Sequence, residues 1–123
     1  MDWKFVLLVA GGGAIGSFLR AFLGFICKIW LPWPTLLINI IGAFLIGICL
    51  KHWEQNGENE LFRAFWIIGI CGGFTTFSTF GVDALNFLKS AQWMNASLYI
   101  GLNVFGTLLS ILLGFRFYSL INP

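Results

Sequence analysis

Four long apolar runs divide the chain, and short segments that carry half of the charged residues separate them. The runs cover about residues 5–26, 35–50, 62–88 and 96–120. A helix needs about 20 apolar residues to cross the hydrocarbon of a bilayer, and its internal hydrogen bonds satisfy the backbone there. The pattern therefore predicts an all-α, four-transmembrane-helix polytopic membrane protein, with a single integral membrane domain over residues 1–123.

Short polar segments connect the four runs. The clearest is Lys51–Leu61, while Lys28–Pro34 and Lys89–Asn95 form shorter turns. Each contains tryptophan, which is enriched at the membrane–water interface. His52, the single histidine, is expected to be an interfacial residue. The first run begins like a signal peptide because Lys4 precedes it, but it is too long and lacks a small-residue cleavage site, so we expect a retained helix.

The composition excludes several classes of protein. Hydrophobic residues make up 59% of the chain and charged residues 10%, whereas a soluble domain has about 25% charged residues, so we expect a multi-pass protein surrounded by lipid. The net charge of +2 comes from dispersed residues, without the basic stripe that a nucleic-acid partner requires. Cys27, Cys49 and Cys71 have no metal-ligand spacing and are expected to pack as small apolar residues. No Ser-His-Asp or Cys-His set is apparent, so an enzyme is not expected.

The distribution of basic residues gives almost no preferred orientation. In a four-span protein both termini and the Lys51–Leu61 segment share one side, which has four basic residues against three on the other. The first side carries Lys4, Lys51, Arg63 and Arg116, and the second carries Arg20, Lys28 and Lys89. Because orientation follows the Lys/Arg bias, the chain could insert both ways. Two oppositely inserted copies would form a dual-topology antiparallel homodimer.

The third run contains an unusual segment, GGFTTFSTF, from Gly72 to Phe80. Glycine weakens a helix, and hydroxyl groups in hydrocarbon need partners. Such a segment is tolerated where it packs inside protein or lines a wet cavity. We therefore expect span three to be broken at Gly72–Thr79, and the break to line a pathway through the bilayer.

Polar side chains in the second and fourth runs are candidates for the wall of this pathway. Asn39 lies near the centre of the second run, where its amide either forms an interhelical hydrogen bond or donates into a pore. Tyr99, Asn103 and Thr107 are spaced i, i+4, i+8 and so share one helix face. Three polar residues on one helix face favour a polar pathway over a chance arrangement of polar residues in a packed helix.

Aromatic and charged residues complete the set of candidates. Phe77 and Phe80 are spaced to share a helix face, and the positive edges of their rings could bind a small anion weakly along a path. Arg20 is expected near a membrane face, where it either draws anions into a vestibule or snorkels to the interface. Asp83 follows Phe80 by three residues and receives no role. No carboxylate lies deep in a run, which argues against proton-coupled transport.

A glycine motif in the first run is better explained by helix packing than by nucleotide binding. Gly11–Gly16 matches G-x-G-x-x-G, but no acidic residue follows it at about 20 residues, as dinucleotide binding requires. Gly12 and Gly16 form G-x-x-x-G, and small residues at this spacing let helices approach closely in lipid. Gly69 and Gly73 repeat the spacing in the third run.

Several of these segments together resemble one known family. Gly72–Phe80 is similar to the G-G-x-T-T-F-S-T-F signature of the CrcB/Fluc fluoride channels. Asn39, in INIIG, resembles their second-helix asparagine motif, and Gly12–Arg20 resembles their glycine-rich first-helix segment. The resemblance covers essentially the whole chain. It implies a dual-topology antiparallel homodimer with two fluoride pores in a microbial plasma or inner membrane, whose passive, fluoride-selective export protects the cell.

The resemblance also implies roles for individual residues. The fluoride pore would use Asn39 as a hydrogen-bond donor, Phe77 and Phe80 as ring edges, Tyr99, Asn103 and Thr107 as a polar track, and Arg20 in the vestibule. Backbone carbonyl groups of Gly72 and Thr75 would bind a structural sodium ion at the dimer interface, where two copies supply four oxygens. Asn103 replaces a serine found in some members of the family.

Two other classes of protein fit part of the pattern. A small dual-topology multidrug exporter has a similar size and charge balance, but such exporters carry a buried glutamate in the first span, which has none here. A non-transporting membrane subunit would explain the glycines, although not the polar row of Tyr99, Asn103 and Thr107. Conduction by the purified protein alone separates these alternatives.

Overall fold

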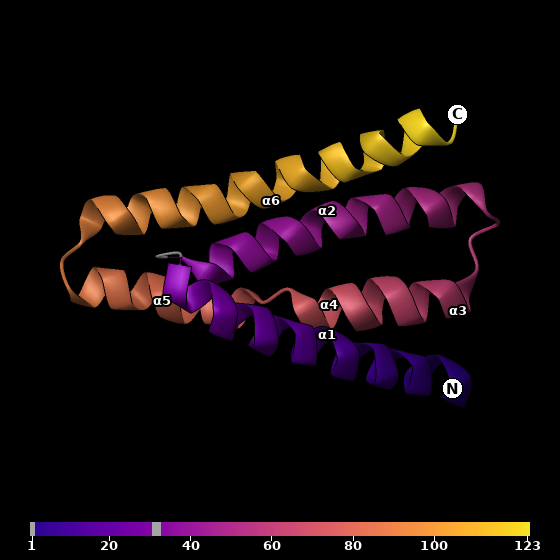
Figure 1. Cartoon of the computed structure of the whole chain (residues 1–123), viewed down its shortest axis with the longest axis horizontal. Helices are drawn as coiled ribbons and strands as arrows, with labels where there is room; N and C mark the ends of the chain where they lie inside the picture. The colour runs from indigo at the N-terminus through magenta and orange to yellow at the C-terminus, as the bar shows by residue number, and fades with distance from the viewer. Residues whose placement is uncertain (1, 31–32) are drawn as a thin grey trace.

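The computed structural model describes residues 2–30 and 33–123, which are helical apart from short connections (Figure 1). Three long helices are α1 (Trp3–Trp30), α2 (Pro34–Gln55) and α6 (Trp93–Ile121). The third span, Glu60–Lys89, consists of α3 (Glu60–Phe62), the π-helical η1 (Arg63–Cys71), α4 (Gly72–Phe74) and α5 (Phe77–Lys89). All four segments are long and apolar enough to cross a membrane. The prediction of an all-α, multi-pass membrane protein with four spans is therefore confirmed.

The helices extend beyond the predicted apolar runs. The prediction of a polar loop over Lys51–Leu61 is wrong at both ends, because α2 continues to Gln55 and α3 begins one residue before the expected end. Lysine, glutamate and glutamine are good helix formers, so they prolong a helix past its apolar part. The chain reverses at Gly57 and Glu58, which have φ of 81° and 54°. The side chain of Asn59 then caps α3.

The two other connections are also shorter than predicted. The turn expected over Lys89–Asn95 consists of Ser90–Gln92 only, since α6 already begins at Trp93. In the turn expected over Lys28–Pro34, α1 continues to Trp30. Residues 31 and 32 of that turn lie outside the described part of the chain.

The long helices pack as two pairs, with α2 beside α6 and α1 against the third span (Figure 1). Glycines make both contacts close. A Cβ atom at Gly47 would collide with the Ile111 carbonyl in α6, and one at Gly16 would collide with the Ile70 carbonyl in η1. A Cβ atom at Gly12 would likewise overlap the η1 backbone. The packing interpretation of the glycine motif in the first run is therefore confirmed.

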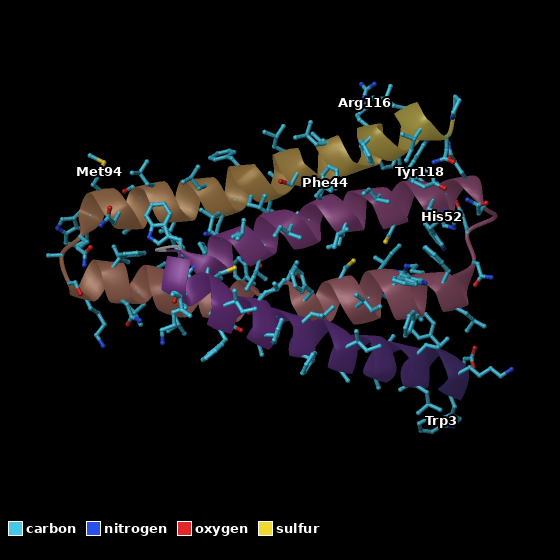
Figure 2. All side chains as sticks on the ribbon, viewed as in Figure 1. Trp3, Phe44, His52, Met94, Arg116 and Tyr118 are labelled. Atoms are coloured by element: carbon cyan, nitrogen blue, oxygen red, sulfur yellow. The ribbon has the colours of Figure 1, made fainter. Side chains whose placement is uncertain are left out.

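Apolar side chains cover much of the outside of the bundle, as expected of a protein in lipid (Figure 2). Trp3 and Met94, near opposite ends of the bundle, are 69% and 73% exposed. At the end that carries both termini, His52 of α2 and Tyr118 of α6 lie side by side (Figure 2), with His52 Nδ1 2.7 Å from the Tyr118 hydroxyl. This hydrogen bond ties the last turns of α2 to α6.

We expect Gly16→Ala to destabilise the protein by about 1–3 kcal/mol, the usual penalty for overpacking a tight contact. The added methyl group meets backbone atoms at Ile70 and Phe74, and backbone cannot change rotamer to make room. Gly11→Ala, on the same helix, is the matched control, because no atom of the described residues lies within 4 Å of its Cβ position. Thermal unfolding in detergent measures both variants. Equal loss of stability in the two would contradict this account of the packing.

Candidate functional site

The third span is interrupted at Thr75 and Thr76, between α4 and α5. Both residues are extended, with φ and ψ of −82° and 156° at Thr75 and of −147° and 124° at Thr76. Of residues 72–79, only these two are non-helical. Their hydroxyl groups serve the adjacent helix ends: Thr75 Oγ1 donates to the Cys71 carbonyl (3.0 Å), and Thr76 Oγ1 accepts from the Thr79 amide (3.2 Å). Threonine thus suits both the extended backbone and the cap.

Asn39 of α2 holds this interruption by its side-chain amide. Its Oδ1 accepts from the Thr76 amide at 2.9 Å, and its Nδ2 donates to the Thr76 carbonyl at 3.0 Å. This two-point contact is what a neighbouring β-strand would offer to an extended residue. Asn39 Nδ2 also donates to Asn103 Oδ1 in α6 at 3.1 Å. The interhelical hydrogen bond that the sequence allowed at Asn39 is therefore confirmed, while donation into a pore stays a prediction.

Arg20 of α1 reaches the same interruption from the other side. Its Nε donates to the Gly73 carbonyl at 3.1 Å. Carbonyl groups at the end of a helix lack intrahelical partners and carry partial negative charge, so they attract a guanidinium group. Since Gly73 lies near the middle of the third span, Arg20 is deeper in the bundle than the membrane face at which the sequence predicts it. An action on anions in a vestibule stays a prediction.

Two other carbonyl groups at the interruption, those of Gly72 and Thr75, accept no side-chain hydrogen bond from the described part of the chain. The neighbouring carbonyl groups of Gly73 and Thr76 are occupied by Arg20 and Asn39. Free carbonyl oxygens are ligands that a hard cation accepts. The donor set expected for a sodium ion is therefore present in its chemistry.

A cavity of about 330 Å³ opens beside the interruption, and we call it the central cavity. Residues from α2, α5, α6 and the interruption line it: Asn39, Ala43, Ile46, Thr75, Thr76, Phe77, Phe80, Asn103, Val104, Thr107 and Leu108. None of these side chains is ionisable. A ligand in the central cavity would therefore meet neutral hydrogen-bonding groups and aromatic rings, a setting in which an ion is held weakly enough to leave again.

Two phenyl rings form one wall of the central cavity. The ring centroids of Phe77 and Phe80 are 5.4 Å apart and their planes are inclined by 46°. Phe80 is only 8% exposed and stacks on Tyr99, with centroids 5.7 Å apart. Phe77, by contrast, is 82% exposed on the single chain. One ring is thus fixed inside the bundle, and the other stands at its surface.

A second cavity, of about 220 Å³, lies toward the turn between α5 and α6. Tyr99 and Asp83 line it, and the Tyr99 hydroxyl donates to Asp83 Oδ2 at 2.6 Å. The polar row on α6 therefore divides: Tyr99 faces the second cavity, while Asn103 and Thr107 line the central cavity. Sequence reasoning missed the role of Asp83, although its spacing from Phe80 places both on the face of α5 that meets α6.

Fold and site define a small membrane protein of four spanning helices, in which an interrupted third span lies beside an uncharged, partly polar cavity. Residues 7–115 match the family described as CrcB-like protein, Camphor Resistance (CrcB). The chain belongs to this family. The match confirms the resemblance seen in the GGFTTFSTF segment and around Asn39.

Curated relatives cover nearly the same length. A protein of Nitrobacter winogradskyi is 40% identical over 105 residues, which are 81% of this chain and 83% of the relative. One of Psychrobacter cryohalolentis is 38% identical over 125 residues, or 98% of this chain and 99% of the relative. One of Rhizobium meliloti is 37% identical over 118 residues, or 89% and 91%. Each relative is named as the fluoride-specific ion channel FluC, a channel and not an enzyme.

Proposed function

We propose that this chain forms a passive, fluoride-selective channel that exports cytoplasmic fluoride and so relieves its toxicity. The observation that carries the proposal is the central cavity, whose wall combines the rings of Phe77 and Phe80 with neutral polar groups and no fixed charge. Ring edges carry partial positive charge, and hydroxyl or amide groups donate hydrogen bonds, so a small anion finds several weak contacts there. The name of the relatives supports fluoride as that anion.

A passive pathway is sufficient for export. Hydrogen fluoride is a weak acid that crosses a membrane uncharged and ionises inside, so fluoride becomes trapped. An inside-negative membrane potential then drives the anion out, with about 2.3 kcal/mol for one charge at 100 mV. The proposed location is accordingly the plasma or inner membrane of a microbial cell, across which such a potential exists.

The passive mechanism is tested by imposing a potassium-diffusion potential on liposomes that contain only the purified protein. Fluoride should move at a rate set by that potential, with equal pH on both sides. Movement only under a pH gradient would contradict a passive channel and favour a coupled exporter. The small multidrug exporter that the size of the chain allows would also transport organic cations, which the channel should exclude.

The chain is proposed to work as an antiparallel homodimer. Phe77, Ser78 and Thr79 are exposed near the middle of the third span, where lipid offers no partner to a hydroxyl group. A second copy that covers this surface would give those groups a protein environment and complete the pore wall at Phe77. Setting Arg20 aside at the interruption, four basic residues remain at one end and two at the other, a small bias that still permits insertion both ways.

Reporter tags at the C-terminus test the dual topology. In cells that express the full chain, one population of tags should be accessible from the cytoplasm and another from outside, in similar amounts. Adding three lysines after Pro123 should shift the population toward a cytoplasmic C-terminus, because basic residues stay inside. Tags on one side only would contradict the antiparallel homodimer.

A structural sodium ion is proposed at the dimer interface, held by the carbonyl oxygens of Gly72 and Thr75 from each copy. Bound sodium would stabilise the folded dimer by about 2.7 kcal/mol at a concentration 100 times its Kd. We therefore expect the unfolding temperature in detergent to rise with sodium chloride and not with an equal concentration of N-methylglucamine chloride. Identical unfolding temperatures in the two salts would contradict the proposed sodium site.

A further inference from the structure

We propose that Cys49 and Cys71 form a two-thiol site that binds the mercuric ion, a soft divalent cation. The inference goes beyond the proposed channel, because neither residue belongs to the wall of the central cavity and the site requires no fluoride. It depends on the position of the two thiols, on the ligands around them and on the charge that a membrane span tolerates.

The fold brings these two thiols together from different spans. Cys49 lies in α2 and Cys71 is the last residue of η1, and α2 packs against η1. The two side chains are close enough to interact through a hydrogen bond, and both thiols are free. Cys71 is only 3% exposed, while Cys49 is half-buried. A cation between them would therefore be enclosed on one side by the bundle and approached from the side of Cys49.

The number and the type of ligands restrict the cation. Thiolates are soft ligands and select soft cations over sodium or magnesium. A structural zinc ion takes four ligands, and no group of three or more metal-ligating side chains is present in residues 2–30 and 33–123. Two sulfur atoms alone satisfy a cation that prefers two ligands on opposite sides, as the mercuric ion and copper(I) do. The ligand set therefore disfavours zinc and leaves these two.

The balance of charge decides between the two remaining cations. When the mercuric ion binds, two S–H bonds break, two S–Hg bonds form, and two protons leave to water without any change of oxidation state. The product is neutral, because two thiolates balance the two positive charges. Copper(I) with the same ligands would leave one net negative charge, which is costly inside a membrane span. The site therefore favours the divalent ion.

An occupied site would act on the interruption of the third span. The Cys71 carbonyl accepts hydrogen bonds from the Thr75 amide and from Thr75 Oγ1, both at 3.0 Å. A linear S–Hg–S bridge fixes the separation of the two sulfur atoms, so α2 and the end of η1 have to adjust to it. Since Thr75 is bonded to Cys71, this adjustment reaches the interruption, and we expect occupancy to lower fluoride flux.

The direct test measures mercury on the purified full-length protein in detergent. Each protein receives an equimolar amount of mercuric chloride and is then passed through gel filtration with a monothiol such as glutathione in excess, and retained mercury is measured by elemental mass spectrometry. Wild type and C27A should each retain one mercuric ion per chain. C49A and C71A should lose it to the monothiol, because a single thiol lacks the high effective concentration of a linked pair.

The control C27A removes the third thiol of the chain and leaves the pair intact. Equal retention of mercury by C27A and C49A, both folded by size-exclusion chromatography, would overturn the inference. C49A, at the less buried of the two positions, decides the question on its own if C71A does not fold.

Fluoride release from liposomes tests the consequence for the interruption. Mercuric chloride is uncharged and enters a bilayer, so it should slow release through wild type and C27A, leave C49A unchanged, and lose its effect when a dithiol is added. Equal inhibition of wild type and C49A would overturn the inference while the proposed channel stands. Wild-type liposomes that release no fluoride even without mercury would overturn the proposed function, whereas the retention of mercury would still establish the two-thiol site.

Discussion

Phe80→Ile is expected to reduce fluoride flux about 10- to 100-fold while the protein stays folded, because an aliphatic side chain has no electropositive edge to offer an anion. Phe80 is the buried member of the ring pair in the central cavity, at 8% exposure. Its stacking on Tyr99 fixes the direction of the ring edge. The measurement is fluoride release from liposomes at matched protein content, with size-exclusion chromatography as the check on folding.

Phe105→Ile is the matched control for this prediction. Phe105 is 73% exposed on α6 and does not line the central cavity, so the same loss of a ring should leave flux near the wild-type value. Equal flux in the two variants, both folded, would remove the Phe80 ring from the mechanism.

Asn39→Asp should nearly abolish fluoride flux and lower stability. A carboxylate keeps the acceptor for the Thr76 amide but loses both donors, and it sets an oxygen against the Thr76 carbonyl and Asn103 Oδ1. Each buried polar group left without its partner costs about 1–3 kcal/mol. Asn39 lines the central cavity, so the new acceptor, and any charge it carries, would also oppose the passage of an anion.

The control for Asn39→Asp is Asn95→Asp, an exposed position near the start of α6 whose side-chain amide donates to Gln92 Oε1 and to no other described residue. It carries the same chemical change and should alter neither flux nor unfolding temperature appreciably. Fluoride flux and thermal unfolding are measured on both proteins. Wild-type flux in a stable Asn39→Asp variant would show that neither donor of Asn39 matters to conduction.

The sequence predicts the spans well because hydrophobic length alone selects a membrane-crossing helix. It is less informative at helix ends, where residues such as Lys51 and Gln55 are compatible with either helix or loop. The Gly/Thr segment predicts a break over residues 72–79, a longer stretch than the structure interrupts. Of these residues, only Thr75 and Thr76 are non-helical. Gly73 remains helical where the backbone of Gly13 in α1 packs closely against it.

The contacts that organise the site were beyond sequence reasoning. Asn39 bonds to residues 37 and 64 positions away, and such pairs depend on the rotation of each helix about its own axis. Periodicity places polar residues on a face but does not say which face meets which. The same holds for Arg20, whose partner carbonyl exists only because the third span is interrupted nearby.

The central claim, selective passive passage of fluoride, is tested most directly by ion release from liposomes that contain only this purified protein. Fluoride and chloride are followed in parallel with ion-selective electrodes, and protein-free liposomes give the background. Fast fluoride release with chloride retained is the predicted result. Retention of both ions by liposomes shown to contain folded protein, or equal release of both, would contradict the account.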